Sequence, residues 1–253
     1  MTQAPYLQRV AILGERVKDP KIWPYTLPFV PGLSLEFRHA VTFFVGENGS
    51  GKSTLIEAIA EASGLPVSGG GTNEGADRHG PELHSALGGA LRASFRARPD
   101  DRYFFRAEFQ AHLASLLDQR REDPEFGGDP YERYGGRSLH TRSHGEAFLA
   151  MLIGRLDSGL ILMDEPESAL SPQRQLSLLA RMAEMVSAGE SQFLIATHSP
   201  ILLTYPGADI VSFDSPSLAP VRLEDTSHYQ ITKGILENPD RYWRHLKRGA
   251  IEA

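Results

Sequence analysis

The stretch Gly46-Glu47-Asn48-Gly49-Ser50-Gly51-Lys52-Ser53 decides the fold of this chain. It matches the pattern G-x-x-x-x-G-K-[ST], in which glycine-rich backbone wraps phosphate groups at the start of a helix. Residues 40–45 before it are apolar and rich in β formers, and residues 54–62 after it place apolar side chains at helical spacing. The order strand, loop, helix is the context that a phosphate-binding loop requires. A chance glycine-rich turn is a poor alternative in that context.

Two side chains of this stretch have predicted roles of their own. Lys52 is expected to reach the outer phosphates of a nucleotide, and the Ser53 hydroxyl is expected to ligate Mg²⁺. The glycines leave backbone N–H groups free to point at the phosphates, where the helix N-terminus carries partial positive charge.

The composition excludes several classes of protein. The chain has 253 residues, enough for one large α/β domain or two small ones, with 41% hydrophobic and 23% charged residues, as in ordinary globular proteins. The absence of cysteine excludes disulfides, iron–sulfur clusters and thiolate zinc sites. No apolar run approaches the length of a membrane span, and the N-terminus has no signal segment, so we expect a cytoplasmic protein. The net charge of −6 argues against a general nucleic-acid binder but allows a local basic patch.

The periodicity of the chain predicts alternating strands and helices, which favour a mainly parallel sheet covered by helices on both faces. Strands are expected at 7–13, 40–45, 102–107, 159–163, 192–197 and 209–213, with further extended segments at 27–37 and 89–98. Helices are expected at 54–62, 109–121, 145–156, 172–187 and 232–246, the last one interrupted at Pro239. The prolines in 27–37 indicate an antiparallel portion near an edge. The glycine-rich residues 68–75 are interpreted as a surface loop rather than a second phosphate loop.

Acidic residues follow one of the buried strands. The apolar residues 160–163 lead directly into Asp164 and Glu165, and acids at the carboxyl end of a parallel strand lie where such sheets bind ligands. Asp164 would hold Mg²⁺, and Glu165 would act as the general base for an attacking water. The alternative is that the two acids only begin a polar turn.

A histidine follows the next apolar strand along the chain, in Thr197-His198-Ser199-Pro200. Its position one strand after the acids favours a role in hydrogen bonding to the terminal phosphate or in orienting water. A histidine that is merely satisfied at a strand end is the alternative.

Ser143-His144-Gly145-Glu146 opens the helix that precedes the acidic strand. Ser143 followed three residues later by Glu146 forms a capping box, which is a structural explanation for both residues. A functional interpretation is that this helix start binds a phosphate.

Together these motifs make the chain resemble the ATP-binding cassette (ABC) class of P-loop ATPases, and in particular small soluble ATPases akin to recombination-repair and SMC head domains. Residues from Gly46 to Thr54 resemble the Walker A loop, and 160–165 resemble Walker B with its catalytic glutamate. Residues 143–146 resemble a variant signature motif, 168–171 the D-loop, and His198 the switch histidine. The best match to the Q-loop glutamine is Glu108, which could contact Mg²⁺ or water or be a surface acid; Gln110 is second. Tyr25 lies at a suitable distance to stack on adenine, and a core aromatic is the alternative.

The resemblance implies a single ABC-type α/β domain over 1–253, with an antiparallel N-terminal β portion and a small helical insert over approximately 67–145. It also implies an ATPase that uses ATP and Mg²⁺ and forms a head-to-tail homodimer on binding ATP. In that dimer Ser143 and Gly145 of one subunit would contact the γ-phosphate held by Lys52 of the other. Hydrolysis through Glu165 would open the dimer.

Three functions remain open from the sequence. The first is a soluble ATPase in DNA maintenance, defence or regulation, with DNA or an unidentified protein as partner. The second is the ATP-binding subunit of a membrane transporter, whose partner would lie in the membrane. The third is a binding switch with little turnover, which the intact set Lys52, Asp164, Glu165 and His198 disfavours. The basic, aromatic residues 242–248 are expected to form an amphipathic helix packed on the domain, with a nucleic-acid or partner contact as the alternative.

Overall fold

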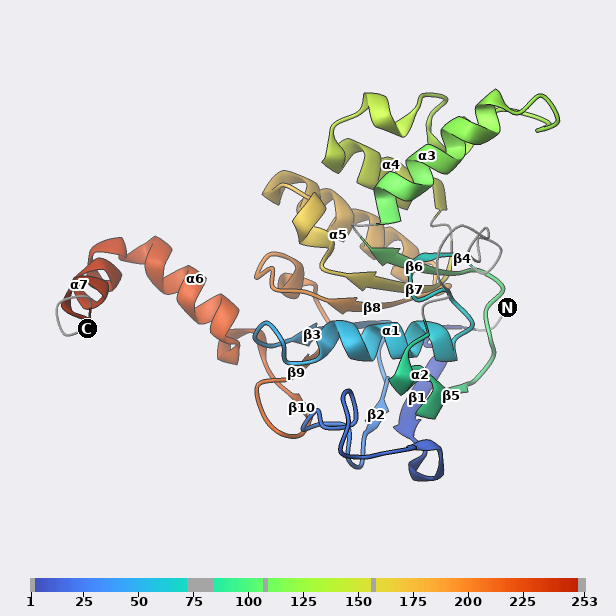
Figure 1. The fold of residues 1–253 in the computed structure, drawn as a ribbon. Coiled ribbons are helices and arrows are strands. Elements are labelled where there is room, and N and C mark those ends of the chain that lie inside the picture. Colours follow the sequence, from blue (N-terminus) through green and yellow to red (C-terminus); the bar gives the residue numbers. More distant parts are fainter. Residues whose placement is uncertain (1–2, 72–83, 107–108, 156–157, 250–253) are drawn as a thin grey trace.

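The computed structural model describes residues 3–71, 84–106, 109–155 and 158–249 (Figure 1). Its main sheet is seven-stranded, in the order β10-β9-β3-β8-β7-β6-β4. These strands are β10 (Ala219–Pro220), β9 (Asp209–Ser212), β3 (Val41–Val45), β8 (Ser191–Ala196), β7 (Gly159–Asp164), β6 (Arg102–Arg106) and β4 (Gly70–Gly71). The strands from β9 to β6 are parallel to one another, and β10 and β4 are antiparallel to their neighbours. The predicted mainly parallel sheet is therefore confirmed.

A second sheet is antiparallel and has the order β2-β1-β5, formed by β2 (Ser34–Glu36), β1 (Leu7–Ile12) and β5 (Leu91–Phe95). It confirms the predicted antiparallel β portion. The extended structure predicted for 27–37 is wrong in its first part, because turns occupy the residues up to 32 and only Ser34–Glu36 join a strand. Pro28 and Pro31 cannot donate to a strand ladder, which explains why pairing begins after them.

Two hydrophobic cores lie on opposite faces of the main sheet, as the alternation of side chains in β3 shows: Phe43 belongs to one core and Phe44 to the other. One core contains side chains of α1 (Lys52–Ala62), α2 (Ala86–Ala90) and the antiparallel sheet. The other contains side chains of α3 (Phe109–Glu122), α4 (His144–Arg155) and α5 (Pro172–Ser187). Helices thus cover both faces, as predicted.

The strand register brings three carboxyl ends to one edge of the main sheet. Ala196 at the end of β8 pairs with Phe44 of β3 and with Asp164 of β7, and Asp164 pairs with Arg106 of β6. Ligands of parallel α/β sheets bind at this edge. The loops that leave it therefore form the candidate site.

The range 67–145 contains more than helices. Within it the short helix α2 precedes β5, which joins the antiparallel sheet, and β6, which joins the main sheet; the longer helix α3 begins at Phe109. Gly70–Gly71 form β4 beside β6, where Gly71 faces the Tyr103 ring, so the surface loop predicted for 68–75 is wrong at these two residues. Residues 72–75 of that prediction lie outside the described residues. The division into one domain with an insert stays a prediction.

The C-terminal helices α6 (Ser227–Glu237) and α7 (Pro239–Gly249) project away from the main sheet (Figure 1). The predicted break at Pro239 is confirmed. The expectation that 242–248 pack on the domain is wrong, because α7 packs against α6, where Gly234 leaves room for the Tyr242 ring. Trp243 is 55% exposed. None of the helices in the described ranges is long and apolar enough to cross a bilayer.

The remaining short elements are 3-10 turns at Gly14–Arg16, Glu132–Tyr134, Leu139–Thr141, Pro166–Ala169, Leu202–Thr204 and Leu223–Asp225.

Candidate active site

The loop between β3 and α1 curls around the Lys52 side chain. Gly49 and Gly51 have positive φ angles of 80° and 97°, and Gly51 is the residue that caps α1. The buried Lys52 ammonium donates to the carbonyl oxygens of Gly46 and Glu47, at 2.7 and 3.0 Å. The loop therefore closes on its own lysine.

The charge of Lys52 is only weakly compensated in this arrangement. Burial lowers the pKa of its ammonium, while Glu165, Asp164 and other nearby carboxylates act in the opposite direction. Its hydrogen-bond partners are neutral carbonyls, so an anionic phosphate oxygen would be a stronger partner than either. The ammonium is thus placed to exchange loop carbonyls for a phosphate.

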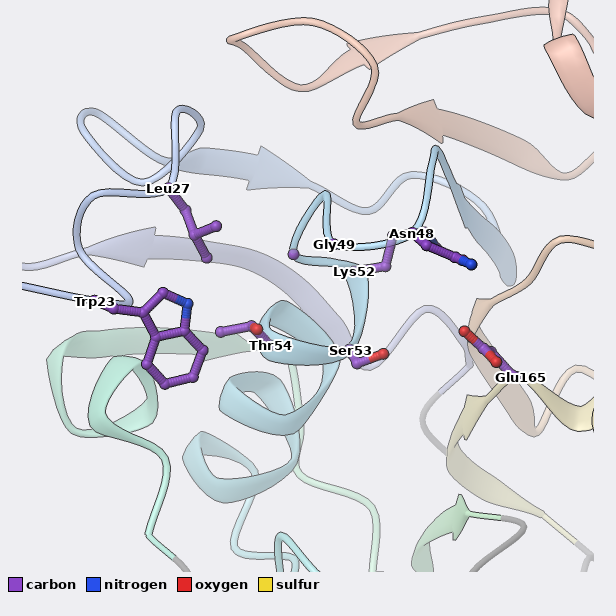
Figure 2. A pocket seen from close by; sticks show the side chains of 9 residues that line it. Trp23, Leu27, Asn48, Gly49, Lys52, Ser53, Thr54 and Glu165 are labelled. Carbon is purple, nitrogen blue, oxygen red and sulfur yellow. The ribbon is translucent and has the colours of Figure 1, made fainter.

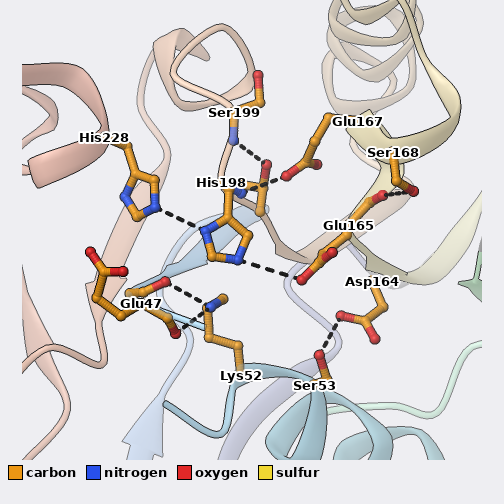
Figure 3. Close-up of polar contacts among 12 residues, drawn as sticks. Glu47, Lys52, Ser53, Asp164, Glu165, Glu167, Ser168, His198, Ser199 and His228 are labelled. Carbon is orange, nitrogen blue, oxygen red and sulfur yellow. Dashed lines mark hydrogen bonds and ion pairs between the residues drawn. The ribbon is translucent and has the colours of Figure 1, made fainter. Parts of the chain in front are cut away.

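Ser53 and Asp164 meet beneath the loop, where the Ser53 hydroxyl donates to Asp164 Oδ1 at 3.0 Å (Figure 3). Burial raises the pKa of Asp164 to about 6, against the opposing effect of Arg106. A hydroxyl and a carboxylate are hard oxygen ligands of the kind Mg²⁺ prefers. The described residues contain no cluster of three or more His, Asp or Glu that could hold a metal. Ser53 and Asp164 would be two of the ligands of a magnesium ion bound here.

An arginine that the sequence placed only in a strand completes this region. Arg106 Nη1 lies 2.8 Å from Glu57 Oε1 of α1, and Nη2 lies 3.9 Å from Asp164 Oδ2. The sequence could have indicated the contact between Arg106 and Asp164, because two strands that are parallel neighbours both end in a charged residue and their register places these residues side by side. Glu108, the predicted Q-loop residue and metal contact, lies outside the described residues.

Glu165 follows β7 in a left-handed conformation, with φ 48° and ψ 55°. Its N–H donates to the Ala196 carbonyl at 2.9 Å, and its own carbonyl accepts from the Ser168 hydroxyl at 2.7 Å. The carboxylate is left 44% exposed, with Oε1 3.4 Å from His198 Nε2. The backbone is fixed on both sides while the carboxylate faces the site.

His198 is held from three directions (Figure 3). Its backbone N–H donates to the carboxylate of Glu167, whose pKa burial raises. Its Nδ1 lies 2.9 Å from Nε2 of His228, and its Nε2 faces Glu165. Burial, and next the charge of Lys52, lower the pKa of His198. Nothing in the local sequence indicated His228, which comes from the start of α6.

A cavity of about 210 Å³ opens beside the loop, and Figure 2 shows the side chains around it. Trp23 and Leu27 form one side of it and Glu165 another. Its remaining lining residues come from the loop and the first turn of α1: Asn48, Gly49, Gly51, Lys52, Ser53 and Thr54. Predicted loop residues and the predicted base thus share one cavity.

Tyr25 does not face this cavity, so the expectation that it stacks on adenine is not supported. Its ring is buried in the core beneath the antiparallel sheet, and its hydroxyl donates to the Ala86 carbonyl at 2.7 Å. Trp23, two residues earlier, lines the cavity and is 67% exposed.

Of the other phosphate-loop residues, Ser50 has a buried hydroxyl with no hydrogen bond to the described part of the chain.

Ser143 and Gly145 lie away from that cavity, at the start of α4. The capping box is confirmed: the Ser143 N–H and hydroxyl both donate to Glu146 Oε2, at 3.0 and 2.9 Å, and the Glu146 N–H donates back to the Ser143 hydroxyl. A Cβ on Gly145 would lie 2.9 Å from the carbonyl oxygen of Ala169. Gly145 therefore lets α4 approach the turn Pro166–Ala169, a structural reason for glycine that is independent of phosphate binding.

Comparison with known proteins gives two partial family matches. Residues 28–116 match the model of an AAA domain, and residues 146–204 match a model described as an AAA domain, putative AbiEii toxin, type IV TA system. No curated protein matches the sequence significantly.

Among the solved structures that resemble the chain, two ATP-binding cassettes share its fold. The ADP conformation of MJ1267, an ATP-binding cassette of an ABC transporter, has a TM-score of 0.55 at 18% identity, over 91% of this chain and 100% of that one. A nucleotide-free ATP-binding cassette from an ABC transporter has a TM-score of 0.51 at 18% identity, over 92% and 96%. An SMC head domain from Thermotoga maritima reaches 0.44 at 17% identity, over 86% and 98%.

Proposed function

We propose that this chain, a P-loop protein with the fold of ABC-type ATP-binding cassettes, binds ATP and hydrolyses it to ADP and phosphate. One observation carries the proposal. The phosphate loop, the Ser53–Asp164 pair, Glu165 and His198 come from separate parts of the sequence and converge at the carboxyl edge of one parallel sheet. These are the groups that phosphoryl transfer to water requires.

ATP would bind in the cavity beside the loop. Its phosphates would lie along Gly46, Asn48, Gly49, Ser50 and Gly51 to Thr54, at the N-terminus of α1. Lys52 would leave the loop carbonyls for the outer phosphates. The exposed indole of Trp23 would stack on the base, because it is the aromatic side chain that lines the cavity.

Glu165 would accept the proton of the attacking water, and its partly exposed carboxylate 3.4 Å from His198 suits that role. His198 would donate a hydrogen bond to the terminal phosphate. Ser53 and Asp164 would hold Mg²⁺, which supplies charge neutralisation for the β- and γ-phosphates when bound. Glu108 is retained as a proposed contact of this ion.

The functional unit would be an ATP-dependent homodimer. Ser143 and Gly145 do not line the cavity beside their own phosphate loop, which supports a nucleotide contact made through a second copy. A head-to-tail arrangement would place the helix start of α4 from one subunit against the phosphates on Lys52 of the other.

The process we favour is a cytoplasmic one in DNA maintenance, defence or regulation, with a protein or DNA partner. The family description that mentions a toxin of a toxin–antitoxin system supports this choice. The alternative, an ATP-binding subunit of a membrane transporter, is supported by the cassettes of ABC transporters that share the fold.

The test uses Glu165→Gln, which should bind ATP without hydrolysing it. Its mass is measured by light scattering with and without Mg-ATP, beside Lys52→Ala, which should not bind. Ser143→Ala and Ser143→Asp are then combined with Glu165→Gln; aspartate preserves the helix cap but places a negative charge against the γ-phosphate. Glu146→Gln is the control, because glutamine maintains the capping box.

We expect ATP to shift Glu165→Gln from monomer to dimer, and both Ser143 variants to prevent the shift. A protein that binds ATP and stays monomeric would refute the homodimer. Absence of ATP turnover by the unmodified protein, with and without duplex DNA, would refute the ATPase itself.

A further inference from the structure

The two histidines at the site, His198 and His228, come from different parts of the fold. His198 follows β8, and His228 lies in the first turn of α6, the helix that projects from the sheet (Figures 1 and 3). We propose that His228 is a positioning residue that holds His198 in the tautomer with a proton on Nε2, facing Glu165 and the terminal phosphate. This inference rests on the proposed ATPase function.

Of the two ring nitrogens that face each other, only one can carry a proton. His198 Nδ1 and His228 Nε2 are 2.9 Å apart, and the ring centroids are 5.0 Å apart at an angle of 57°. A hydrogen bond of this length needs a donor nitrogen on one ring and a lone pair on the other. If both facing nitrogens carried a proton, two N–H groups would point at each other.

Either His198 donates to His228 or His228 donates to His198. The neighbour of His198 Nε2, on the other side of the ring, decides between these two arrangements. Its Nε2 lies 3.4 Å from Glu165 Oε1. If His198 donated from Nδ1, its Nε2 would present a lone pair to a carboxylate oxygen, which is repulsive. If His228 donates from Nε2, His198 accepts at Nδ1 and presents an N–H toward Glu165. Burial lowers the pKa of His198 and so favours its neutral ring. Of the two neutral arrangements, only the second satisfies both neighbours.

The position of His228 is fixed by the cap of its helix. The buried Thr226 hydroxyl accepts the N–H of Tyr229 at 3.3 Å and donates to the Leu223 carbonyl at 2.8 Å. His228 Nδ1 is buried and has no hydrogen-bond partner in the described ranges, consistent with a bare lone pair there.

The proton on His198 is then available to a ligand. His198 Nε2 is buried and forms no hydrogen bond with the described residues, although Glu165 is near. A phosphate oxygen between Lys52 and Glu165 would give this N–H a partner. His228 thus contributes to turnover without touching the nucleotide.

The experiment compares two variants of nearly equal shape. His228→Gln can place an N–H the same number of bonds from Cβ as histidine Nε2, whereas His228→Glu offers only acceptor oxygens above neutral pH. Ile231→Ala, an exposed position on the same helix, is the control. Steady-state kcat and KM for Mg-ATP are measured at pH 8.5, and ¹⁵N NMR of histidine-labelled protein reports the His198 tautomer, assigned with His198→Gln.

We expect the glutamine variant to keep kcat within about threefold and the Nε2–H tautomer of His198. The glutamate variant should lose about tenfold in kcat, because the loss of a residue that orients a functional histidine commonly has an effect of this size. Its KM should change little, and the His198 proton should move to Nδ1. Equal kcat and an unchanged tautomer in both variants would overturn the inference, as would equal losses in both.

The NMR signal separates this inference from the proposed function. If the unmodified protein hydrolyses no ATP but its His198 is an Nε2–H tautomer that moves in His228→Glu, the ATPase proposal fails and the positioning stands. If ATP is hydrolysed and the tautomer does not depend on His228, the positioning fails alone. Thermal unfolding confirms that each variant folds before either comparison is made.

Discussion

The Ser53 hydroxyl donates to Asp164 Oδ1 over 3.0 Å, so the first turn of α1 and the end of β7 share one buried polar contact. Burial raises the pKa of Asp164 to about 6 from its ordinary value of 3.8. Burial of a carboxylate that would hold a magnesium ion therefore destabilises the protein when the ion is absent and the carboxylate is charged, although the Ser53 hydroxyl offsets part of this effect.

Asp164→Asn tests how much the buried, charged carboxylate of Asp164 lowers the free energy of unfolding. Between pH 4 and 6 the folded state binds more protons at Asp164 than the unfolded state, so this group makes the free energy of unfolding fall as pH rises through that window. The loss is complete above pH 6 and amounts to roughly 2–3 kcal/mol. We expect Asp164→Asn to match the unmodified protein at pH 4 and to exceed it by roughly 2 kcal/mol at pH 8 in urea unfolding without nucleotide. A difference that does not change with pH would contradict the prediction.

Gly51→Ala and Gly49→Ala form a matched pair in the phosphate loop. Both residues have positive φ, which costs an L-residue roughly 1–2 kcal/mol. A Cβ on Gly49 would meet nothing within 4 Å, whereas a Cβ on Gly51 would lie 2.7 Å from the Phe29 ring. We expect Gly51→Ala to destabilise by about 1–3 kcal/mol more than Gly49→Ala, because overpacking adds to the backbone cost. Chemical unfolding of the nucleotide-free variants measures the difference, and equal losses would refute it.

Trp23→Ala tests base stacking. Stacking of an aromatic side chain on a base contributes roughly 1–3 kcal/mol, so the variant should bind ATP about tenfold more weakly. Its affinity for inorganic triphosphate should not change, because in the proposed binding mode the indole would stack on the base and leave the phosphates to the loop. Calorimetric titration measures both affinities.

Tyr25→Phe is the control for that experiment. It removes the hydrogen bond to the Ala86 carbonyl and should lower the free energy of unfolding by about 1 kcal/mol without changing ATP affinity. Weaker ATP binding in Tyr25→Phe than in Trp23→Ala would reverse the assignment of the two aromatics.

A double-mutant cycle tests the ion pair of Arg106 with Glu57. Arg106→Met leaves the carboxylates of Glu57 and Asp164 without this cation in a largely buried site, so it should destabilise by roughly 3 kcal/mol. In a Glu57→Gln background the same change should cost roughly 1 kcal/mol less, since one of the two charges is gone. Additive effects within the error of unfolding measurements would show that the pair contributes no coupling.

The predictable parts of the site are those in which neighbours in sequence are neighbours in space. The loop from Gly46 to Ser53 lies between a strand and a helix, and Asp164 and His198 each follow a run of apolar residues. Local patterns suffice there, because hydrophobic strands and a glycine-rich turn fix where the next polar residue points. The capping box of Ser143 and Glu146 was predictable for the same reason.

The residues that were missed act across the fold. His228 reaches His198 from a helix 30 positions away, and Arg106 meets Asp164 through strand register. Whether Trp23 or Tyr25 lines the cavity depends on how the turns around these residues orient their side chains. Turns have no periodicity from which burial could be inferred. The packing of α7 on α6 depends on the absence of a side chain at Gly234, which sequence patterns do not weigh.

Glu165 is the one non-glycine residue with positive φ in the described ranges. An L-residue other than asparagine or aspartate rarely adopts this conformation, and it costs on the order of 1 kcal/mol. In a library randomised at this position and selected only for heat resistance, glycine and asparagine should therefore outcompete glutamate. Natural selection would then retain glutamate here for its role in catalysis, although it lowers the stability of the fold. A homologue with glycine at this position would be more heat-resistant but would no longer hydrolyse ATP.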